Sequence, residues 1–536
     1  MTTLPAPAPR AGAGGRARGR QRRAIALAVG LAALLPALVG PVPAPAADMP
    51  SRVLPDVPVT GTDERLQLGH NSPVLLADPD DPSFVVLAHR LDNPDFNCAL
   101  QVSGDGGRSW LPVRPVPALP PGADKCYAPE IAFDDDGVLH YLFIALQGQG
   151  NSPSGTYLVT SDDRGRTFTP PRQVLGPERY MVRMAIDHTR GRAGRIHLVW
   201  LETSSDPPLG GLPSPPNPIL SAWSDDGGET FSNPVQVSDP ARQRVVAPAL
   251  ALGPDGAVHV VYYDLQDDAR DYQGLEGPVW EGSWSLVLSS SADGATFSPG
   301  AVVDGDIVPT ERVMLIYTMP PPALAADGGG VFVAWPDARG GDWDVLLRRS
   351  ADVGRTWEPP QRLNDDPSGN GRHQYLPRLS ASSDGRLDAL FYDRRNDPAN
   401  VLNDVFLTSS SDGGRTFSPN LQLNSESFSS QIGTRYPIPS ARGLVEFGSR
   451  LALVADPSRT LAAWTDTRNQ DVDGLGQDVF ATEVERPGGA GGGGDGGSSA
   501  PWVAAVAVVV GLGLAAGIVV GMRRRRPSGP AAGAQA

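Results

Sequence analysis

The sequence repeats one short motif six times. Residues 410–417 read SSDGGRTF, and close variants begin at Ser103, Ser161, Ser224, Ser290 and Ser350. Successive starts are 58 to 66 residues apart, a period that is typical of an array of supersecondary units. Each copy is framed by short runs that alternate apolar and polar residues, which predict β-strands. The chain is therefore constrained to a repetitive all-β architecture.

The letters of the motif predict a tight turn. The carboxylate at its third position can accept hydrogen bonds from the backbone N–H groups that follow it. The glycine at its fifth position supplies a positive φ that a side chain resists, and the final Trp or Phe offers apolar area for packing between sheets. In the fourth copy, SSADGATF, Ala292 occupies the third position and Asp293 lies next to it.

This motif, SxDxGxTW/F, resembles the Asp-box, or bacterial neuraminidase repeat (BNR), of the sialidase superfamily. The resemblance covers about residues 103–417. It implies a β-propeller in which each box closes the hairpin of one blade. In that family the box lies away from the active site, so the motif marks the fold and does no chemistry itself.

The number of blades follows from the second strand of each unit, and seven such strands are found. They are Phe84–Ala88, Leu139–Phe143, Ile196–Trp200, Val258–Tyr263, Val331–Trp335, Leu387–Tyr392 and Leu461–Trp464. We therefore predict seven blades. The family resemblance implies six, which is the alternative.

The last unit has neither a box nor a fourth strand of its own. Near the N-terminus, Arg65–Gly69 (RLQLG) resembles the fourth strands of other units, such as Asn420–Asn424 (NLQLN). We expect this segment to pair with Asp478–Glu483 and complete the seventh blade, because a closed ring leaves no open sheet edge.

Both ends of the chain carry targeting signals. An arginine-rich lead, an apolar run over residues 24–40 and small residues up to Ala47 predict a signal peptide, with the choice between the general secretory and twin-arginine routes open. Trp502–Met522 is uncharged and long enough to cross a bilayer, and the four arginines after it place the end of the chain in the cytoplasm. The expected organisation is signal peptide 1–47, lead-in 48–64, propeller 65–486, glycine-rich linker 487–500, transmembrane helix 501–522 and cytoplasmic tail 523–536.

Charge and cysteine content narrow the partners. Ten of the 45 basic residues lie in the two terminal segments, so the exported part has 35 basic and 60 acidic residues, a net charge near −25. This charge argues against nucleic acid as a partner. Cys98 and Cys126 are the two cysteines, and outside the cell we expect them to form a disulfide, with two free thiols as the alternative. No Cys/His cluster predicts a metal site, and we expect no cofactor.

The first strand of each propeller blade lines the central channel, so aligning these strands identifies the side chains that face the axis. The aligned residues are Val74, Glu130, Arg183, Ala249, Ala323, Arg378 and Arg450. Family sialidases hold the substrate carboxylate with three arginines and use a tyrosine paired with a glutamate as nucleophile. The resemblance thus implies Arg183, Arg378 and Arg450 as substrate-binding residues.

The same resemblance implies a catalytic set. The candidates are Tyr436 as nucleophile, with Glu130 and Glu446 as acidic residues near it. The family's F/Y-R-I-P motif before the first box has no counterpart here, where the chain reads Asn71-Ser72-Pro73; Tyr436-Pro437-Ile438-Pro439 is similar to it at another place.

Each of these interpretations has a structural alternative. Inward arginines can pair with acidic neighbours, and the Asp-x-Arg sequences after several second strands can form salt bridges and turn caps. The acidic segments Asp264–Asp271 and Asp471–Asp478 are either solvated loops or calcium sites, and solvated loops are favoured because the spacing fits no EF-hand loop.

Two functions therefore remain open. The first is a monomeric, membrane-tethered sialidase-like glycoside hydrolase (exo-α-sialidase type) on the extracellular side, with a glycan or glycoconjugate as its substrate. The second is a non-catalytic propeller that binds a glycan or a protein at the cell envelope.

Overall fold

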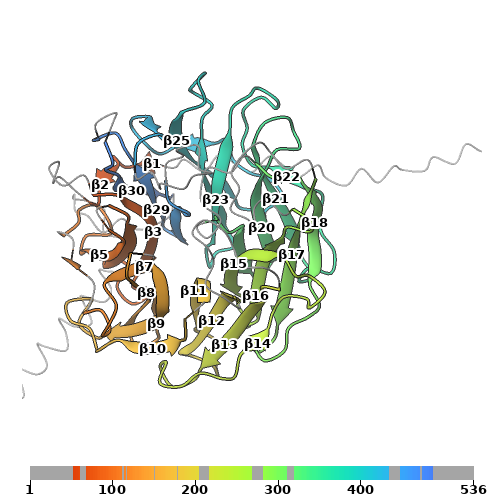
Figure 1. Ribbon diagram of the computed structural model, residues 1–536. Helices are drawn as coiled ribbons and strands as arrows, with labels where there is room; N and C mark the ends of the chain where they lie inside the picture. The colour runs from red at the N-terminus through yellow and green to blue at the C-terminus, as the bar shows by residue number, and fades with distance from the viewer. Residues whose placement is uncertain are drawn as a thin grey trace, which may run out of the picture. The chain divides into compact units, whose positions relative to one another are not determined.

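The strands pair into seven sheets that surround a common axis (Figure 1). The computed structural model describes residues 52–60, 68–93, 95–111, 114–115, 118–149, 151–177, 179–203, 216–268, 282–310, 319–433, 447–470 and 474–486. The predicted signal peptide, linker, transmembrane helix and cytoplasmic tail lie outside these residues, as do Tyr436 and Glu446. No helix in the described ranges is long and apolar enough to span a bilayer.

Each sheet is one antiparallel blade, so the seven-blade prediction is confirmed over the six-blade alternative. The first three blades, each ordered from the axis outward, are β3 (His70–Ala77), β4 (Val85–Leu91), β5 (Asn97–Ser103) and β6 (Arg114–Pro115); β7 (Lys125–Phe133), β8 (Leu139–Gln147), β9 (Ser152–Ser161) and β10 (Arg172–Leu175); and β11 (Arg179–Asp187), β12 (Arg195–Glu202), β13 (Ile219–Ser224) and β14 (Val235–Gln236).

The next three blades follow the same order. They are β15 (Val245–Leu252), β16 (Val258–Asp264), β17 (Trp284–Ser291) and β18 (Ala301–Ile307); β19 (Ala323–Asp327), β20 (Gly330–Asp337), β21 (Asp344–Ser350) and β22 (Gln361–Arg362); and β23 (Gln374–Ala381), β24 (Leu387–Asp393), β25 (Leu402–Ser410) and β26 (Leu421–Gln422), with β27 (Phe428–Ser429) also on β25. The seventh blade contains β28 (Ala452–Asp456), β29 (Arg459–Asp466) and β30 (Asp478–Glu485).

The N-terminal part of the chain completes this seventh blade, but the predicted segment was wrong. Two short strands, β1 (Arg52–Val53) and β2 (Val57–Pro58), pair with β30. They occupy the edge that was assigned to Arg65–Gly69, of which the structure describes Leu68 and Gly69 alone. Strands of two residues are too short to show an alternating pattern, whereas the RLQLG segment does show one.

The hydrophobic core lies between neighbouring blades. All residues of β16 and of β24 are buried, because neighbouring sheets cover both faces of a second strand. Trp200, Trp335 and Trp464 are among the largest fully buried side chains. Each donates its indole N–H to an acidic residue two positions later, at 2.7, 2.9 and 3.0 Å respectively.

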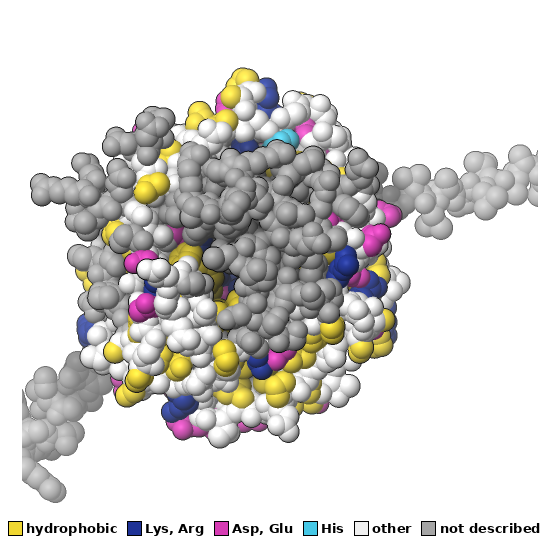
Figure 2. Space-filling model, in the orientation of Figure 1, with side chains coloured by type: hydrophobic (Ala, Val, Ile, Leu, Met, Phe, Trp, Pro, Cys, Tyr) yellow, Lys and Arg dark blue, Asp and Glu magenta, His cyan; other side chains and the backbone are white. Residues whose placement is uncertain are grey.

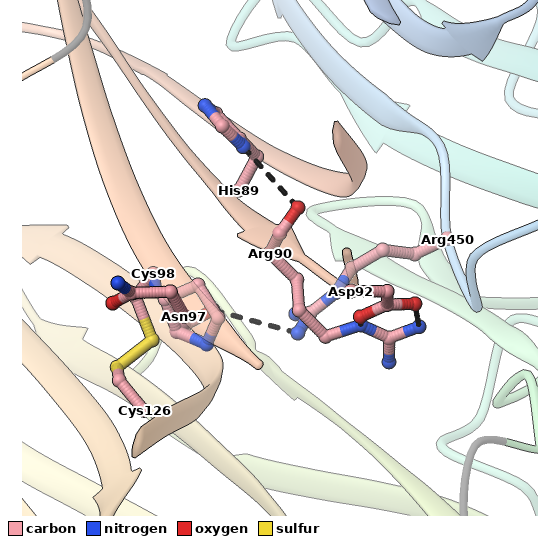
Figure 3. Close-up of a disulfide and its surroundings, with 8 residues drawn as sticks. His89, Arg90, Asp92, Asn97, Cys98, Cys126 and Arg450 are labelled. Atoms are coloured by element: carbon pink, nitrogen blue, oxygen red, sulfur yellow. Dashed lines mark hydrogen bonds and ion pairs between the residues drawn. A yellow bond between two sulfur atoms is a disulfide. The ribbon is translucent and has the colours of Figure 1, made fainter. Parts of the chain in front are cut away.

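The disulfide prediction is confirmed. Cys98 of β5 and Cys126 of β7 are bonded, with their Cα atoms 5.5 Å apart (Figure 3). The bond joins the third strand of the first blade to the first strand of the second blade. Beside it, Arg90 forms an ion pair of 2.6 Å with Asp92. The bond therefore links two blades covalently on the side of the ring where first strands begin.

The box turns have the hydrogen bonds that their letters predict. In the second box, Asp163 accepts bonds from the Thr167 hydroxyl at 2.7 Å and from the Thr167 and Arg166 backbone N–H groups at 2.8 and 2.9 Å. The Ser161 hydroxyl donates to the same carboxylate at 2.9 Å. In the fourth box, Asp293 accepts from Ser291 at 3.2 Å, so it takes the place of the missing third-position carboxylate.

These bonds make the boxes sensitive to acid. Chiefly because the Thr167 hydroxyl stabilises the ionised form, the pKa of Asp163 is lowered to about 2. A lowered folded-state pKa gives stability that is present above the unfolded value of about 3.9 and is lost as pH falls through 2. We expect Asp163→Asn to make the fall in melting temperature between pH 4 and pH 2 shallower than in the wild type.

The matched control for this measurement is Asp162→Asn. Asp162 is the neighbouring residue, is exposed, and makes no hydrogen bond to a described residue. Thermal unfolding of the three proteins at pH 2, 3, 4 and 7 provides the comparison. Equal slopes for Asp163→Asn and Asp162→Asn would contradict this account of the box.

Candidate functional site

Five of the first strands share an irregularity that sequence analysis missed. In β3, β7, β11, β15 and β23 the pairing with the second strand skips two residues. At each skip one non-glycine residue has a positive φ of 49–57°: Ser72, Ala128, Met181, Ala247 and Leu376. This conformation costs about 1–2 kcal/mol per residue, and such strain is found where a backbone is held for a function. The bulges re-aim the residues that follow them.

The residue two positions after each strained residue is the predicted axial residue. In each second strand we count from the residue that pairs with the box serine, which is Ser291 in the fourth box. The fourth residue lies opposite the predicted axial residue of the first strand: Val74, Glu130, Arg183, Ala249, Ala323 and Arg378. β20 and β29 both end in Trp-x-Asp. Counted from this ending, the residue of the last blade that is equivalent to Ala323 is Ala452, which lies opposite Ala463.

Arg450 therefore does not share the register of the other two arginines. It lies two residues before Ala452, ahead of β28. The sequence alignment was wrong here by two residues, because the pairing of β28 with β29 places Ala452, and not Arg450, at the axial level. A shift of two keeps the side chain on the same face of the strand.

The four charged residues that were predicted at the axis line one cavity. All seven innermost segments contribute to it: Glu130, Arg183, Arg378 and Arg450 surround it together with apolar residues such as Val74, Ala249 and Leu324. The volume of the cavity is about 100 Å³. Near the middle of the face shown in Figure 2, hydrophobic and basic side chains are visible at a hollow. We call this space the axial cavity.

One carboxylate lies between two of the arginines. Oε1 of Glu130 accepts a hydrogen bond from Nη1 of Arg183 at 3.2 Å and another from Nη1 of Arg450. The side chains of Glu130, Arg183 and Arg450 are 9, 14 and 11% exposed, so this contact is largely shielded from water. The bulge in β7 places Glu130 here, and Arg450 reaches it from the seventh blade.

Arg378 differs from the other two arginines. Its guanidinium makes no hydrogen bond or ion pair with a described residue, and the residue is exposed to the channel. Desolvation by the surrounding protein atoms nevertheless lowers the pKa of Arg378. The charge of Arg450 also lowers it, whereas Glu130 opposes the shift. Arg378 is thus a cation in the cavity that makes no direct ion pair with a described residue.

The electrostatics of the axial cavity favour an anion. Desolvation, together with the charges of Arg450 and Arg378, lowers the pKa of Arg183 to about 10, while Glu130 opposes this shift. Three guanidinium groups face one carboxylate among the described residues, so a bound anion would reduce the excess positive charge. Guanidinium groups bind carboxylates through paired hydrogen bonds. The arrangement can therefore hold a negatively charged group at Arg378.

The other predicted residues do not meet at this cavity. Tyr436 and Glu446 lie outside the described residues, so their position relative to the arginines stays a prediction. No tyrosine, aspartate or histidine is among the described residues that line the axial cavity. Among these residues, Glu130 is the one acidic group available for proton transfer, and it is engaged by two arginines.

The Asp-x-Arg strand ends are salt bridges and turn caps. Asp393 accepts a bond from the backbone N–H of Arg395 at 2.7 Å, and the Arg395 side chain bridges Asp393 to Asp365 of the preceding blade at 2.6 and 2.5 Å. Arg339 and Arg468 repeat this arrangement with their own Asp partners at 2.6 Å. These residues join strands and blades and are not part of the cavity.

Two described aspartates of the segment Asp264–Asp271 bond with side chains of other segments. Asp264 pairs with Arg242 at 2.5 Å, and Asp268 accepts the indole N–H of Trp284 at 2.9 Å. Across the described ranges, no group of three His, Cys, Asp or Glu residues is arranged to hold a metal ion. Residues 269–271 and 471–473 lie outside those ranges.

A second cavity next to the axial cavity was not predicted. It lies between the fourth, fifth and sixth blades and is lined by Tyr263, Trp284, Trp343 and Tyr375, with Pro321 and Leu376. We call it the aromatic pocket. The sequence signal for this pocket is a set of four aromatic residues: one near the end of β16, one at the start of β17, one before β21 and one early in β23. Aromatic residues in strands are usually core residues, so this signal did not stand out.

Comparisons with known proteins agree with the box motif. Residues 218–436 match the family described as "BNR repeat-like domain". This match confirms the resemblance to BNR-repeat propellers that the boxes indicated. No curated protein sequence matches the chain.

Several solved structures resemble the chain weakly. A protein of unknown function from Dyadobacter fermentans is 14% identical, covering 81% of this chain and 99% of its own, with a TM-score of 0.44. The Hadza microbial sialidase Hz136 is 13% identical over 81% and 68% of the two chains, with a TM-score of 0.40. The phage phi92 endosialidase is 10% identical over 83% and 71%, with a TM-score of 0.43. The fold is therefore assigned from the strand pairing and not from these similarities.

Proposed function

We propose that this propeller recognises an acidic glycan and that the sugar carboxylate binds at Arg378 in the axial cavity. The observation that carries the proposal is the placement of Arg183, Arg378 and Arg450 around one cavity whose described lining includes a single carboxylate, Glu130. Because Glu130 engages Arg183 and Arg450, Arg378 is left to bind an external anion. A sugar acid such as sialic acid carries such an anionic group as its carboxylate.

We further propose hydrolysis of the exo-α-sialidase type as the reaction. The BNR-repeat match and the three arginines support this activity. It requires a nucleophile in addition, for which Tyr436 with Glu446 is the candidate pair. A non-catalytic glycan-binding propeller is the second candidate, and it is favoured by the absence of a tyrosine or aspartate among the described residues of the axial cavity.

We also propose that the propeller acts as a monomer on the extracellular side of the cell membrane. The predicted signal peptide and the apolar segment Trp502–Met522 support export and tethering. The Cys98–Cys126 disulfide is in keeping with an oxidising compartment. Two measurements test this placement. Detergent, but not high salt, should release the protein from cells, and protease added to intact cells should cleave it. A protease-resistant or salt-released protein would contradict the proposal.

Arg378→Ala should abolish binding of sialic acid without unfolding the protein. Loss of a charged, paired contact to a carboxylate costs about 2–4 kcal/mol, which corresponds to roughly 30- to 1,000-fold in affinity. The fold should be unaffected, because the Arg378 side chain is exposed and makes no bond to a described residue. Calorimetric titration measures the affinity, and thermal unfolding measures the stability.

Arg355→Ala is the matched control, since Arg355 is an exposed arginine in a box turn. It should bind sialic acid as the wild type does. Equal affinity in Arg378→Ala and the wild type would overturn the proposed site.

A fluorogenic sialoside separates the two candidate functions. If the protein is a hydrolase, the wild type should release the fluorophore, and Tyr436→Phe should remove at least 99% of the activity while sialic acid still binds. Binding without turnover by the wild type would favour the non-catalytic propeller. Full activity of Tyr436→Phe would show that the nucleophile is another residue.

A further inference from the structure

The aromatic pocket and the axial cavity share one wall. Pro321 lines both, and Leu376 and Pro377 of the pocket directly precede Arg378 of the axial cavity. Two peptide units span at most about 7 Å, so one ligand of moderate size can reach both cavities. Leu376 also holds the positive φ of 57°, which means that the strained bulge of β23 forms the boundary between them.

The pocket is aromatic and deep. Tyr263, Trp284, Trp343 and Tyr375 are 4, 6, 6 and 5% exposed. The volume of the pocket is about 70 Å³. The indole of Trp343 stacks on His373, with ring centroids 4.2 Å apart and planes at 9°, and it meets Tyr375 edge-on at 6.1 Å. These contacts hold the lining rings in fixed orientations.

Two of the four polar groups on the lining aromatic residues have no partner among the described residues, whereas the other two do. The Trp284 indole donates to Asp268 at 2.9 Å, and the Tyr375 hydroxyl donates to Asn403 at 2.9 Å. In contrast, the Tyr263 hydroxyl and the Trp343 indole N–H make no hydrogen bond to any described residue. Both residues are more than nine-tenths buried, but neither of these two polar atoms is among the fully buried unpartnered atoms of the described side chains. They lie on residues that line the pocket, where a ligand can bond with them.

We propose that the aromatic pocket is a subsite for the group attached to the acidic sugar. That group is flat and mainly apolar, and it carries a hydrogen-bond acceptor for the Trp343 N–H or the Tyr263 hydroxyl. This inference rests on the proposed binding of the sugar carboxylate at Arg378. Selectivity then has two sources. The charge of the axial cavity selects an acidic sugar, and the aromatic pocket selects the group to which that sugar is attached.

The test compares two glycosides of the same acid. The methyl α-glycoside of sialic acid presents the carboxylate alone, whereas the 4-methylumbelliferyl α-glycoside adds a flat ring with acceptor oxygens. If the substrate is turned over, dissociation constants are measured with a catalytically inactive Tyr436→Phe protein. Burial of about 60 Å² of apolar ligand surface corresponds to about a tenfold gain in affinity. The wild type should therefore bind the umbelliferyl glycoside about ten times more tightly.

Two variants locate this gain. Thr310→Trp adds bulk to a residue that lines the pocket, and it should reduce the ratio of the two affinities to about one while leaving the methyl glycoside unaffected. Tyr263→Phe removes only the hydroxyl, so it should lower the ratio by about two- to fivefold. Tyr262→Phe is the matched control, because Tyr262 is the next residue of β16 and lines neither cavity; it should keep the wild-type ratio.

The outcomes distinguish this inference from the proposed function. Equal affinity of the wild type for both glycosides would overturn the subsite and leave the carboxylate site standing. A tenfold preference that persists in Thr310→Trp and Tyr263→Phe would also overturn it, since the gain would then arise elsewhere. If neither glycoside binds, the proposed function fails first, and the subsite fails with it.

Discussion

A chain that begins at residue 61 should not form a stable ring. It lacks β1 and β2, which close the seventh blade on β30. The backbone N–H groups of Leu54 and Val59 donate to Glu483 and Val479 at 2.9 and 2.8 Å, and Asp56 pairs with Arg468 at 2.7 Å. Loss of five or more such bonds at about 1 kcal/mol each, with an exposed strand edge, is close to the whole stability of a typical domain.

The measurement is thermal unfolding of chains that begin at residues 52 and 61 and end at residue 486. We expect the longer chain to unfold cooperatively, and the shorter one to aggregate or to melt at least about 10 °C lower. Equal melting temperatures would show that the N-terminal strands do not stabilise the ring.

Glu130→Gln should be the most destabilising single substitution in the axial cavity. It leaves Arg183 and Arg450 without their shared carboxylate beside Arg378. Removing one partner of a buried ion pair costs about 3–5 kcal/mol, because the remaining charge stays buried and unpaired. The lowered pKa of Arg183 already reflects its desolvation and the two neighbouring cations. The same change should strengthen anion binding, since no acidic group then competes.

Glu229→Gln is the matched control. Glu229 pairs with Arg172 at the surface, where the two side chains are 64 and 43% exposed, and such a pair contributes about 0–1 kcal/mol. Urea unfolding with and without saturating sialic acid measures both effects. Sialic acid should restore part of the stability lost in Glu130→Gln. Equal destabilisation by the two substitutions would contradict the electrostatic description of the cavity.

The sequence was sufficient to predict the architecture, because each blade carries its own signals. The box recurs with the blade period, and the second strands are apolar throughout, so seven blades could be counted without the structure. Cys98 and Cys126 were placed correctly, since both positions follow from strand order. The axial positions of Glu130, Arg183 and Arg378 could be predicted as well, because strand alternation determines which side chains face the channel.

Features that depend on contacts between distant segments could not be predicted. The bulges before Val74, Glu130 and Arg378 were missed, because their one shared signal, a proline directly after each strained residue, is also typical of ordinary turns. β1 and β2 are two residues each, and only their partner β30 identifies them as strands. The register of Arg450 failed for the same reason, since the length of the lead into β28 is fixed by packing on other blades.

The most direct test of the central claim compares the methyl α-glycoside of sialic acid with the methyl ester of that same glycoside. The ester keeps the ring and removes the negative charge. If Arg378 and its neighbours bind the carboxylate, calorimetry on residues 52–486 should show binding of the acid and at least a 100-fold weaker affinity for the ester, a loss of about 2.7 kcal/mol. Arg378→Ala should bind both compounds equally weakly. Equal affinity of the wild-type protein for the acid and its ester would contradict the account.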